Sequence, residues 1–549
     1  MRDMTRRKAL IGLSALTLVL AGCGGGGDGG EAADPAADSS LSRAGAMADF
    51  GVNQQFKATE PLEFEVLYNN HSFYPNKNDW LFWEELTKRT NVKIKPIEVP
   101  LSDYEQKRGL LVGSGQAPLI IPKTYPGQED TFVSSGAILP VSDYIDLMPN
   151  FKDKVAKWRL EPELNTRRQA DGRFYLLPGL HENVWVDYTL AVRTDIMEEL
   201  NLEVPKTWDE LYEVLKAMKA KYPDRYPMTD RWGDPTPGGN LFKLVAQAYG
   251  TKGGWEYQHA TWDPAAGKFA YTGAMPQYKQ MIEYLHKLVE EKLIDPESFT
   301  QQDEPAKQKF NSGKSFVIGT NAQTLINDYR GPLEKAVKGA KVAKIPVPMG
   351  PVGEYKIGTR LENGIMISSK AKDHPNFVAM MQFIDWLWYS DEGQEFAKWG
   401  VEGTTYTKDS DGNYKIADDI DFIGLNPDAS KHLQKDFGFG NGVFAYGGTT
   451  QLLQSTFSEE EKEFQDVMNA RQQWPVDPPH PFTDEERERS TLWETPLKDH
   501  VTQNTLKFIL GERDLSEWDA YVKELEAKNM TAYIDLVNAA AERFKKEHG

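Results

Sequence analysis

The chain has 549 residues, of which 40% are hydrophobic and 26% charged, so it can fold into more than one domain and is not disordered throughout. Its 82 acidic and 63 basic residues give a net charge of −19, which is unfavourable for binding duplex DNA, and we expect no nucleic-acid partner. The single cysteine excludes an intrachain disulfide and a cysteine-rich zinc site.

The N-terminal residues have the pattern of an export signal. Basic residues at positions 2–8 precede an apolar stretch at 9–21, which is too short to cross a membrane. Positions 20–23 read Leu-Ala-Gly-Cys, the lipobox of bacterial lipoproteins. We therefore predict that residues 1–22 are a signal peptide, and that Cys23 is lipidated and anchors the protein to the outer face of the cell membrane. A signal peptide with a chance cysteine is the alternative.

The export route stays open. Residues 5–10 (TRRKAL) resemble a twin-arginine signal, but Ala9 replaces the usual aromatic residue, so Sec export is the alternative. Residues 23–60 are rich in Gly, Ala, Asp and Ser and show no apolar period, which predicts a flexible tether. A phosphate-binding loop is disfavoured for this glycine run, because no strand precedes it and no Gly-Lys-Ser/Thr follows.

The folded part opens with a strand, a helix and a strand. Residues 62–68 (LEFEVLY) and 91–99 (NVKIKPIEV) predict strands. Between them, Asn78 or Asp79 can cap a helix that runs to Arg89. This order suggests a parallel βαβ unit.

Further elements follow along the chain. Strands are predicted at 173–178, after an Asp-Gly turn, and at 316–318. A capping box over 207–210 predicts a helix start, and apolar periods predict helices at 281–292, 377–388, after a Ser516 cap, and at 534–544. The predicted fold class is α/β with a helical C-terminal region.

Five segments together resemble a known family. They are WEELTKRTNV (83–92), DGRFYLLP (171–178), VRTDIMEELNL with PKTWDE (192–210), DWLWYSDEG with GVEG (385–403), and FILG with WDAYV (508–522). Their order resembles the bacterial extracellular solute-binding proteins of ABC importers, in the maltose-binding-type superfamily. More narrowly, it resembles the large lipoprotein subfamily that serves oligosaccharide importers, including alginate-binding proteins.

The resemblance implies a two-lobed clamp that closes on a ligand about an interlobe hinge. Lobe 1 would comprise 61–180, with about 357–410 returning to it. Lobe 2 would comprise 187–350, with a helical part at about 425–549 packing mainly on it. The chain would cross near 179–186 and 350–362. The sequence shows neither a membrane span nor a nucleotide loop, so we expect the ABC permease and the ATPase to be separate chains, and this chain to be a monomer.

One departure from the family concerns calcium. Relatives often carry an Asp/Asn-rich calcium loop after the helix that begins near position 208, but here residues 219–227 read KAKYPDRYP. One carboxylate among several cations does not supply the oxygen ligands that calcium requires, so we predict no metal site and no cofactor. Residues 409–413 (DSDGN) fit a hairpin turn better than a metal loop.

Sugars present an apolar face and an edge of hydroxyls, so sugar sites pair aromatic rings with planar polar groups. Glu182 matches, by its offset from a proline, an acidic residue that contacts sugar in maltose-type relatives; a structural hinge salt bridge is the alternative. The other candidates lie in predicted loops or at strand ends, where capping or core packing is the alternative. The predicted ligand-binding residues are Asn69, Asn70, His71, Glu182, Trp185, Trp232, Trp255, Trp262, Asn321, Gln323, Arg360, Glu362, Trp399 and Tyr406.

Two other functions compete with oligosaccharide binding. A peptide- or amino-acid-binding member of the same class would clamp its ligand through Arg193 or Arg360. A surface-anchored glycoside hydrolase or lyase would need positioned carboxylates, but no nucleophile or metal motif is present, so we expect no enzymatic activity. The saccharide is left open: uronates would suit Arg193, Arg231 and Arg360, and neutral sugars would suit tryptophan and asparagine.

Overall fold

The computed structural model describes residues 41–231, 238–356, 358 and 360–548. The predicted signal peptide, Cys23, the first part of the predicted tether and Trp232 lie outside the described residues. Within these ranges, no helix combines the length and the apolar character that a membrane span requires.

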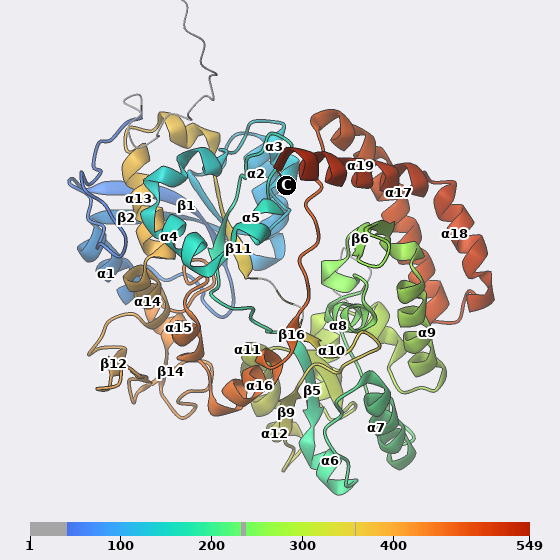
Figure 1. The fold of residues 1–549 in the computed structure, drawn as a ribbon. Helices are drawn as coiled ribbons and strands as arrows, with labels where there is room; N and C mark the ends of the chain where they lie inside the picture. Colours follow the sequence, from blue (N-terminus) through green and yellow to red (C-terminus); the bar gives the residue numbers. More distant parts are fainter. Residues whose placement is uncertain (1–40, 232–237, 357, 359, 549) are drawn as a thin grey trace, which may run out of the picture.

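The first lobe is built on a five-stranded sheet with the order β2-β1-β3-β11-β4 (Figure 1). β1 pairs in parallel with β2 and β3, and β11 pairs antiparallel with β3 and β4. The strand bounds are β1 Leu62–Asn70, β2 Val92–Pro100, β3 Ile120–Thr124, β4 Leu177–Leu180 and β11 Leu361–Ile367. The predicted βαβ unit is therefore confirmed.

Helices cover this sheet. They are α1 Leu81–Thr90, α2 Tyr104–Gly113, α3 Asp130–Val133, α4 Pro149–Trp158, α5 Glu161–Asn165, α13 Phe377–Tyr389 and α14 Asp391–Trp399. All residues of α13 are buried, because this helix is enclosed within the lobe rather than lying on its surface. The predicted cap of α1 was wrong: the N-cap residue is Trp80, which makes no side-chain capping bond.

The second lobe is built on a three-stranded antiparallel sheet with the order β8-β5-β9. Its strands are β5 Thr189–Arg193, β8 Val317–Thr320 and β9 Val342–Ile345, and a separate hairpin joins β6 Ala260–Asp263 to β7 Lys268–Tyr271. Its helices are α6 Thr194–Glu199, α7 Trp208–Lys221, α8 Asn240–Tyr249, α9 Pro276–Glu290, α10 Asp303–Asn311, α11 Ala322–Thr324 and α12 Gly331–Ala336.

The predicted capping box of α7 is half formed. The Thr207 hydroxyl accepts the Glu210 N–H at 3.1 Å, as predicted. The Glu210 carboxylate, however, accepts the N–H of Lys206 at 2.6 Å instead of returning to Thr207. The helix start is therefore where the sequence placed it, with one of its two expected bonds.

The C-terminal part divides between the lobes. α17 Asp484–Ile509, α18 Trp518–Glu526 and α19 Met530–His548 bury their apolar side chains in the second-lobe core and lie along that lobe in Figure 1. Residues 433–452, with α15 Thr450–Gln454, bury theirs in the first-lobe core instead. The predicted assignment of all of 425–549 mainly to lobe 2 is wrong for this segment.

Three segments cross between the lobes. The first joins β4 to β5, the second joins β9 to β11, and the third joins α15 to α16 Glu459–Asn469. Only the first two were predicted. A small apolar cluster joins the first two crossings to α16, and it is formed by Val184, Val186, Val347, Phe464 and Met468.

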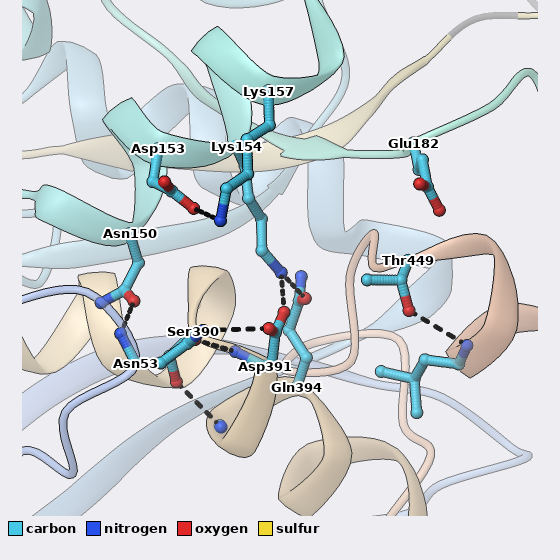
Figure 2. A network of polar contacts seen from close by, with 12 residues as sticks. Asn53, Asn150, Asp153, Lys154, Lys157, Glu182, Ser390, Asp391, Gln394 and Thr449 are labelled. Atoms are coloured by element: carbon cyan, nitrogen blue, oxygen red, sulfur yellow. Dashed lines mark hydrogen bonds and ion pairs between the residues drawn. The ribbon is translucent and has the colours of Figure 1, made fainter.

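The first lobe includes part of the predicted tether. Leu41, Phe56 and Ala58 are buried in its core, so a tether that extends to residue 60 is contradicted. Figure 2 shows how Asn53 is held: its side chain donates to Asp391, and its N–H donates to Asn150 at 2.6 Å.

Three smaller differences concern local elements. The strand predicted at 173–178 begins only at Leu177, because β4 is defined by pairing with β11, far along the chain. Ser516 does not cap α18, whose N-cap residue is Glu517. The turn at 409–413 does join a hairpin, formed by β12 Tyr406–Lys408 and β13 Tyr414–Ile416. The remaining short strands are β10 Tyr355–Lys356, β14 Ile420–Asp421, β15 Lys431–His432 and β16 Gln472–Gln473.

Candidate functional site

A cavity of about 180 Å³ lies where the crossing segments meet the second lobe. Both of the predicted crossings contribute to its wall, and α16 adds a third side. The polar and aromatic residues that line it are His181, Trp185, Asp187, Tyr188, Lys243, Gln247, Glu256, Tyr355, Glu362 and Arg471. A site at the junction of both lobes is where closure and ligand binding are coupled.

Aromatic side chains form one part of this site. The ring of Trp185 lies 5.8 Å from that of His181, and its indole N–H is buried with no hydrogen-bond partner among the described residues. Tyr188 meets Trp255 edge to face with ring centroids 5.0 Å apart. Trp255 is 37% exposed, so its ring offers apolar surface beside the cavity.

Paired charges form the polar part. Lys243 Nζ lies 2.6 Å from the Glu256 carboxylate, which also accepts from Gln247 at 2.9 Å. Glu362 accepts from His181 Nε2 and from a backbone N–H, each at 2.9 Å. Burial opposes ionisation of Glu362, but these bonds and nearby cations lower its pKa to about 2. The cavity therefore presents fixed donors and acceptors beside aromatic faces.

The two lobes also face each other farther along the cleft. Burial lowers the pKa of His71 to about 4, Lys123 of the same lobe adds to this, and Asp328 of the second lobe opposes it. Tyr188 of the second lobe similarly lies within electrostatic reach of Lys123 and Tyr125. Groups at or just after the carboxyl ends of β1 and β3 thus stand within electrostatic reach of groups of the second lobe.

Several predicted ligand residues lie at this site. Trp185 and Glu362 line the cavity, and Trp255 packs on its wall. Asn321 caps α11 and donates to the cavity-lining Asp187 at 3.2 Å. Gln323 bridges the lobes with a 3.4 Å hydrogen bond to Gln434.

The predicted residues at the end of β1 are used mainly inside the first lobe. Asn69 is 1% exposed. Asn70 donates to Glu98 at 2.8 Å and accepts from Asn76 at 3.1 Å, so it organises the turn. His71 stacks on Tyr74 at 4.8 Å and remains partly exposed on the cleft side.

Trp399 and Tyr406 are core residues, so their prediction as ligand residues is corrected. Trp399 is 0% exposed, stacks on Tyr414 at 5.1 Å and donates to Ser455. Tyr406 is 3% exposed and donates to Glu395. Neither side chain lines the cavity.

Two predicted ligand residues in the crossings, Glu182 and Arg360, make structural contacts instead of lining the larger cavity. Glu182 accepts from the N–H of Thr450, at the start of α15, and Figure 2 shows it beside that helix start. It lines a much smaller cavity of about 20 Å³ instead of the larger one. The Arg360 guanidinium donates to Glu163 at 2.6 Å and to the Trp158 carbonyl at 2.7 Å, which closes the end of α4. Both residues hold the hinge in place.

Trp262 lies on the β6–β7 hairpin, where it meets Phe269 edge to face at 5.1 Å. It does not line the cavity. Trp232 lies outside the described residues. Among the described residues, no cluster of three or more His, Cys, Asp or Glu side chains could hold a metal ion.

The sequence prediction missed Tyr188, Lys243, Glu256 and Lys123. Tyr188 stands three residues after Trp185 on the same crossing, so its position in a crossing could have identified it. Lys123 follows the buried pair Ile120 and Ile121 at the carboxyl end of β3, a signal of the same kind as the one used for β1. Lys243 gave no such signal, since it lies within a helix. Glu256 ends a short 3-10 helix and was passed over, although it directly follows the predicted Trp255.

Comparisons with known proteins agree with this architecture. The chain is 24% identical over 335 residues to the polygalacturonan/rhamnogalacturonan-binding protein YtcQ of Bacillus subtilis, a match that covers 60% of this chain and 64% of that protein. It is 24% identical over 502 residues to the fructooligosaccharide ABC transporter substrate-binding protein FusA of Streptococcus pneumoniae, covering 84% and 86%.

A solved structure shows the same fold. Alginate-binding protein AlgQ2 without calcium ion superposes with a TM-score of 0.68 at 21% identity, over 89% of this chain and all of that one. The family described as "Bacterial extracellular solute-binding protein" matches residues 80–395. This match spans both lobes and the first two crossings, and the chain therefore belongs to the family of bacterial extracellular solute-binding proteins.

Proposed function

We propose that this protein is the extracytoplasmic binding component of an ABC importer, that it binds an oligosaccharide between its lobes, and that it delivers the sugar to a separate permease driven by a separate ATPase. The observation that carries the proposal is the cavity at the crossings, in which the unpartnered Trp185 N–H and the Tyr188 ring stand beside fixed polar groups. Aromatic faces with planar polar groups match the two kinds of sugar surface.

The relatives support an oligosaccharide as the ligand, since FusA and YtcQ are named for saccharides. The peptide alternative loses its predicted clamp, because Arg193 is held by Asp195 at 2.5 Å and Arg360 by Glu163. We further propose that the protein acts as a monomer without enzymatic activity and without a cofactor, in keeping with a family of binding proteins.

The function can be tested by equilibrium retention. The purified protein is incubated with a pool of oligosaccharides and, separately, with a pool of peptides, and the retained molecules are identified by mass spectrometry. We expect one intact oligosaccharide per protein and no retained peptide. Retained peptide would contradict the proposal, and so would the appearance of shortened sugars, which would indicate catalysis.

We also propose that Cys23 carries the lipid anchor. The lipobox at 20–23 motivates this, and LipO of Bacillus subtilis, which is named a lipoprotein, is 23% identical over 332 residues. Replacing Cys23 with Ser removes the sulfur that would accept the diacylglyceryl group. We expect an uncleaved precursor or a soluble exported form, measured by membrane fractionation and intact mass. A variant that is processed and partitions into membranes like the wild type would refute the anchor.

A further inference from the structure

Lys123, near the carboxyl end of β3, has a strained backbone. Its φ is 54°, in the left-handed region that residues other than glycine adopt uncommonly and at an energetic cost. Two buried side chains hold it there. The Lys123 N–H donates to the Tyr446 hydroxyl at 2.9 Å, and its carbonyl accepts from the Arg108 guanidinium.

These two supports are themselves fixed. Arg108 is 4% exposed and also donates to Gln128 at 2.7 Å. Tyr446 is 2% exposed and its carbonyl accepts from Gln394. Backbone strain that is maintained by its surroundings clusters at active sites, ligand clamps and switch regions.

The Lys123 ammonium group lies on the cleft side of the first lobe among neutral hydroxyls. It stands 6.0 Å from the centre of the Tyr125 ring and beside the Tyr74 hydroxyl. Burial raises the pKa of Tyr74 and Tyr446, so these hydroxyls carry no charge at neutral pH. Gly442 leaves room for the Tyr74 hydroxyl and for the ammonium, because a Cβ at that position would lie 2.8 Å from the hydroxyl oxygen and 3.1 Å from Nζ.

Three other cations near the cleft have acidic partners. Lys243 pairs with Glu256 at 2.6 Å, Lys307 with Asp328 at 2.7 Å, and Arg231 with Asp303 at 3.6 Å. These three pairs all lie in the second lobe.

Lys123 differs from these three cations, because no carboxylate among the described residues forms an ion pair with it. Glu362 is the carboxylate that acts on the Lys123 ammonium group, which it stabilises electrostatically without forming an ion pair, and that carboxylate already accepts from His181 and Gly447.

We propose that Lys123 recognises an anionic substituent on the bound sugar, so that the ligand is an acidic oligosaccharide carrying a carboxylate or a sulfate. The proposal rests on the proposed function and narrows its ligand class. An ammonium group that is partly buried, rigidly placed and without a counter-ion gains a charge-assisted hydrogen bond from such a group. A neutral sugar would leave the charge uncompensated.

The test compares matched pairs of sugars by titration calorimetry. One arm uses uronic-acid oligosaccharides of two to six residues, each with its carboxyl-reduced neutral form, and the other uses sulfated oligosaccharides with their desulfated forms. In at least one pair, wild-type protein should bind the acidic member about 10-fold or more tightly than the neutral one, which is the effect of a hydrogen bond to a charged group. Equal binding, or a preference for the neutral members, would overturn the inference.

Variants then assign the preference to Lys123. Lys123→Met, which keeps the length and the backbone strain, should reduce the acidic preference to under about threefold while the neutral member binds as before. Lys123→Arg should retain most of the preference. Gly442→Ala, which keeps the charge but displaces the ammonium, should weaken the acidic member alone.

Each failure has its own meaning. An acidic preference that survives Lys123→Met in a protein with unchanged melting temperature refutes the role of Lys123. An equal loss of acidic and neutral binding refutes charge recognition. If neutral sugars bind and acidic ones do not, the proposed function stands and this inference fails. If the protein retains no sugar of either kind, the proposed function fails with it.

Discussion

Replacing Lys344 with Met is expected to lower the free energy of unfolding by about 3–5 kcal/mol, the cost of leaving one member of a buried ion pair without its partner. Lys344 Nζ lies 2.7 Å from Glu461, and the two side chains are only 1% and 5% exposed. The Glu461 carboxylate would keep a hydrogen bond from Gln465 but lose its counter-charge. Denaturant unfolding of the variant and the wild type measures the difference.

The matched control removes both charges. Lys344→Met combined with Glu461→Leu should recover most of the lost stability, because an apolar pair of similar volume avoids the desolvation of two ions. A second control, Lys462→Met, breaks the exposed pair with Glu459 in the same helix and should change stability by less than about 1 kcal/mol. If the double variant were as unstable as Lys344→Met alone, the unpaired charge of Glu461 would not be the cause of the lost stability.

This ion pair also shows why the third crossing escaped sequence analysis. It joins β9 to α16 across more than a hundred residues, and α16 in turn packs its Phe464 and Met468 against the first two crossings. Nothing local to 455–458 marks a crossing, since the segment is short and lacks glycine or proline. The position of this third crossing follows only from the packing of the helices on either side of it: α15 packs on the first-lobe core, and α16 packs on the apolar cluster of the first two crossings.

Local patterns predicted the elements whose partners are adjacent in sequence. β1, α1 and β2 form a contiguous unit, α7 and α9 carry apolar periods, and α13 is apolar nearly all round. β4 was predicted with the wrong start and β11 was not predicted, because the pairing of Leu177 with Ile365 helps to define both strands. The same limit applied to the site: Trp185 and Glu362 were found from their place in predicted crossings, whereas Lys243 reaches the cavity only through the packing of α8.

Trp399 illustrates how composition misled the site prediction. It precedes a turn at 400–403 that is rich in glycine, and this pattern is typical of an exposed loop. In the structure it is the last residue of α14, and Gly400 at φ 94° ends the helix. The glycine that ends α14 was therefore mistaken for part of a binding loop, although the side chain of Trp399 is buried in the core.

Trp255 and Trp399 differ in burial, and we expect their replacement by alanine to have very different effects on stability. Trp399→Ala should lower the free energy of unfolding by about 3–5 kcal/mol, because it removes a fully buried indole and leaves a cavity. Trp255→Ala should cost less than about 1.5 kcal/mol of stability, since its ring is 37% exposed and packs mainly on Tyr188.

The effects of the two substitutions on ligand affinity should be reversed, with Trp255→Ala weakening binding more than Trp399→Ala. Trp255→Ala removes an aromatic face beside the cavity and should weaken oligosaccharide binding by about 1–2 kcal/mol, or roughly 5- to 30-fold. Trp399→Ala should leave the affinity of the folded fraction unchanged, because the indole has no access to the cleft. Calorimetric affinity and denaturant unfolding, measured on both variants, separate the two roles. Were Trp255→Ala to bind like the wild type, its ring would have no part in holding the sugar, and the binding surface would have to be sought nearer Trp185 and Tyr355.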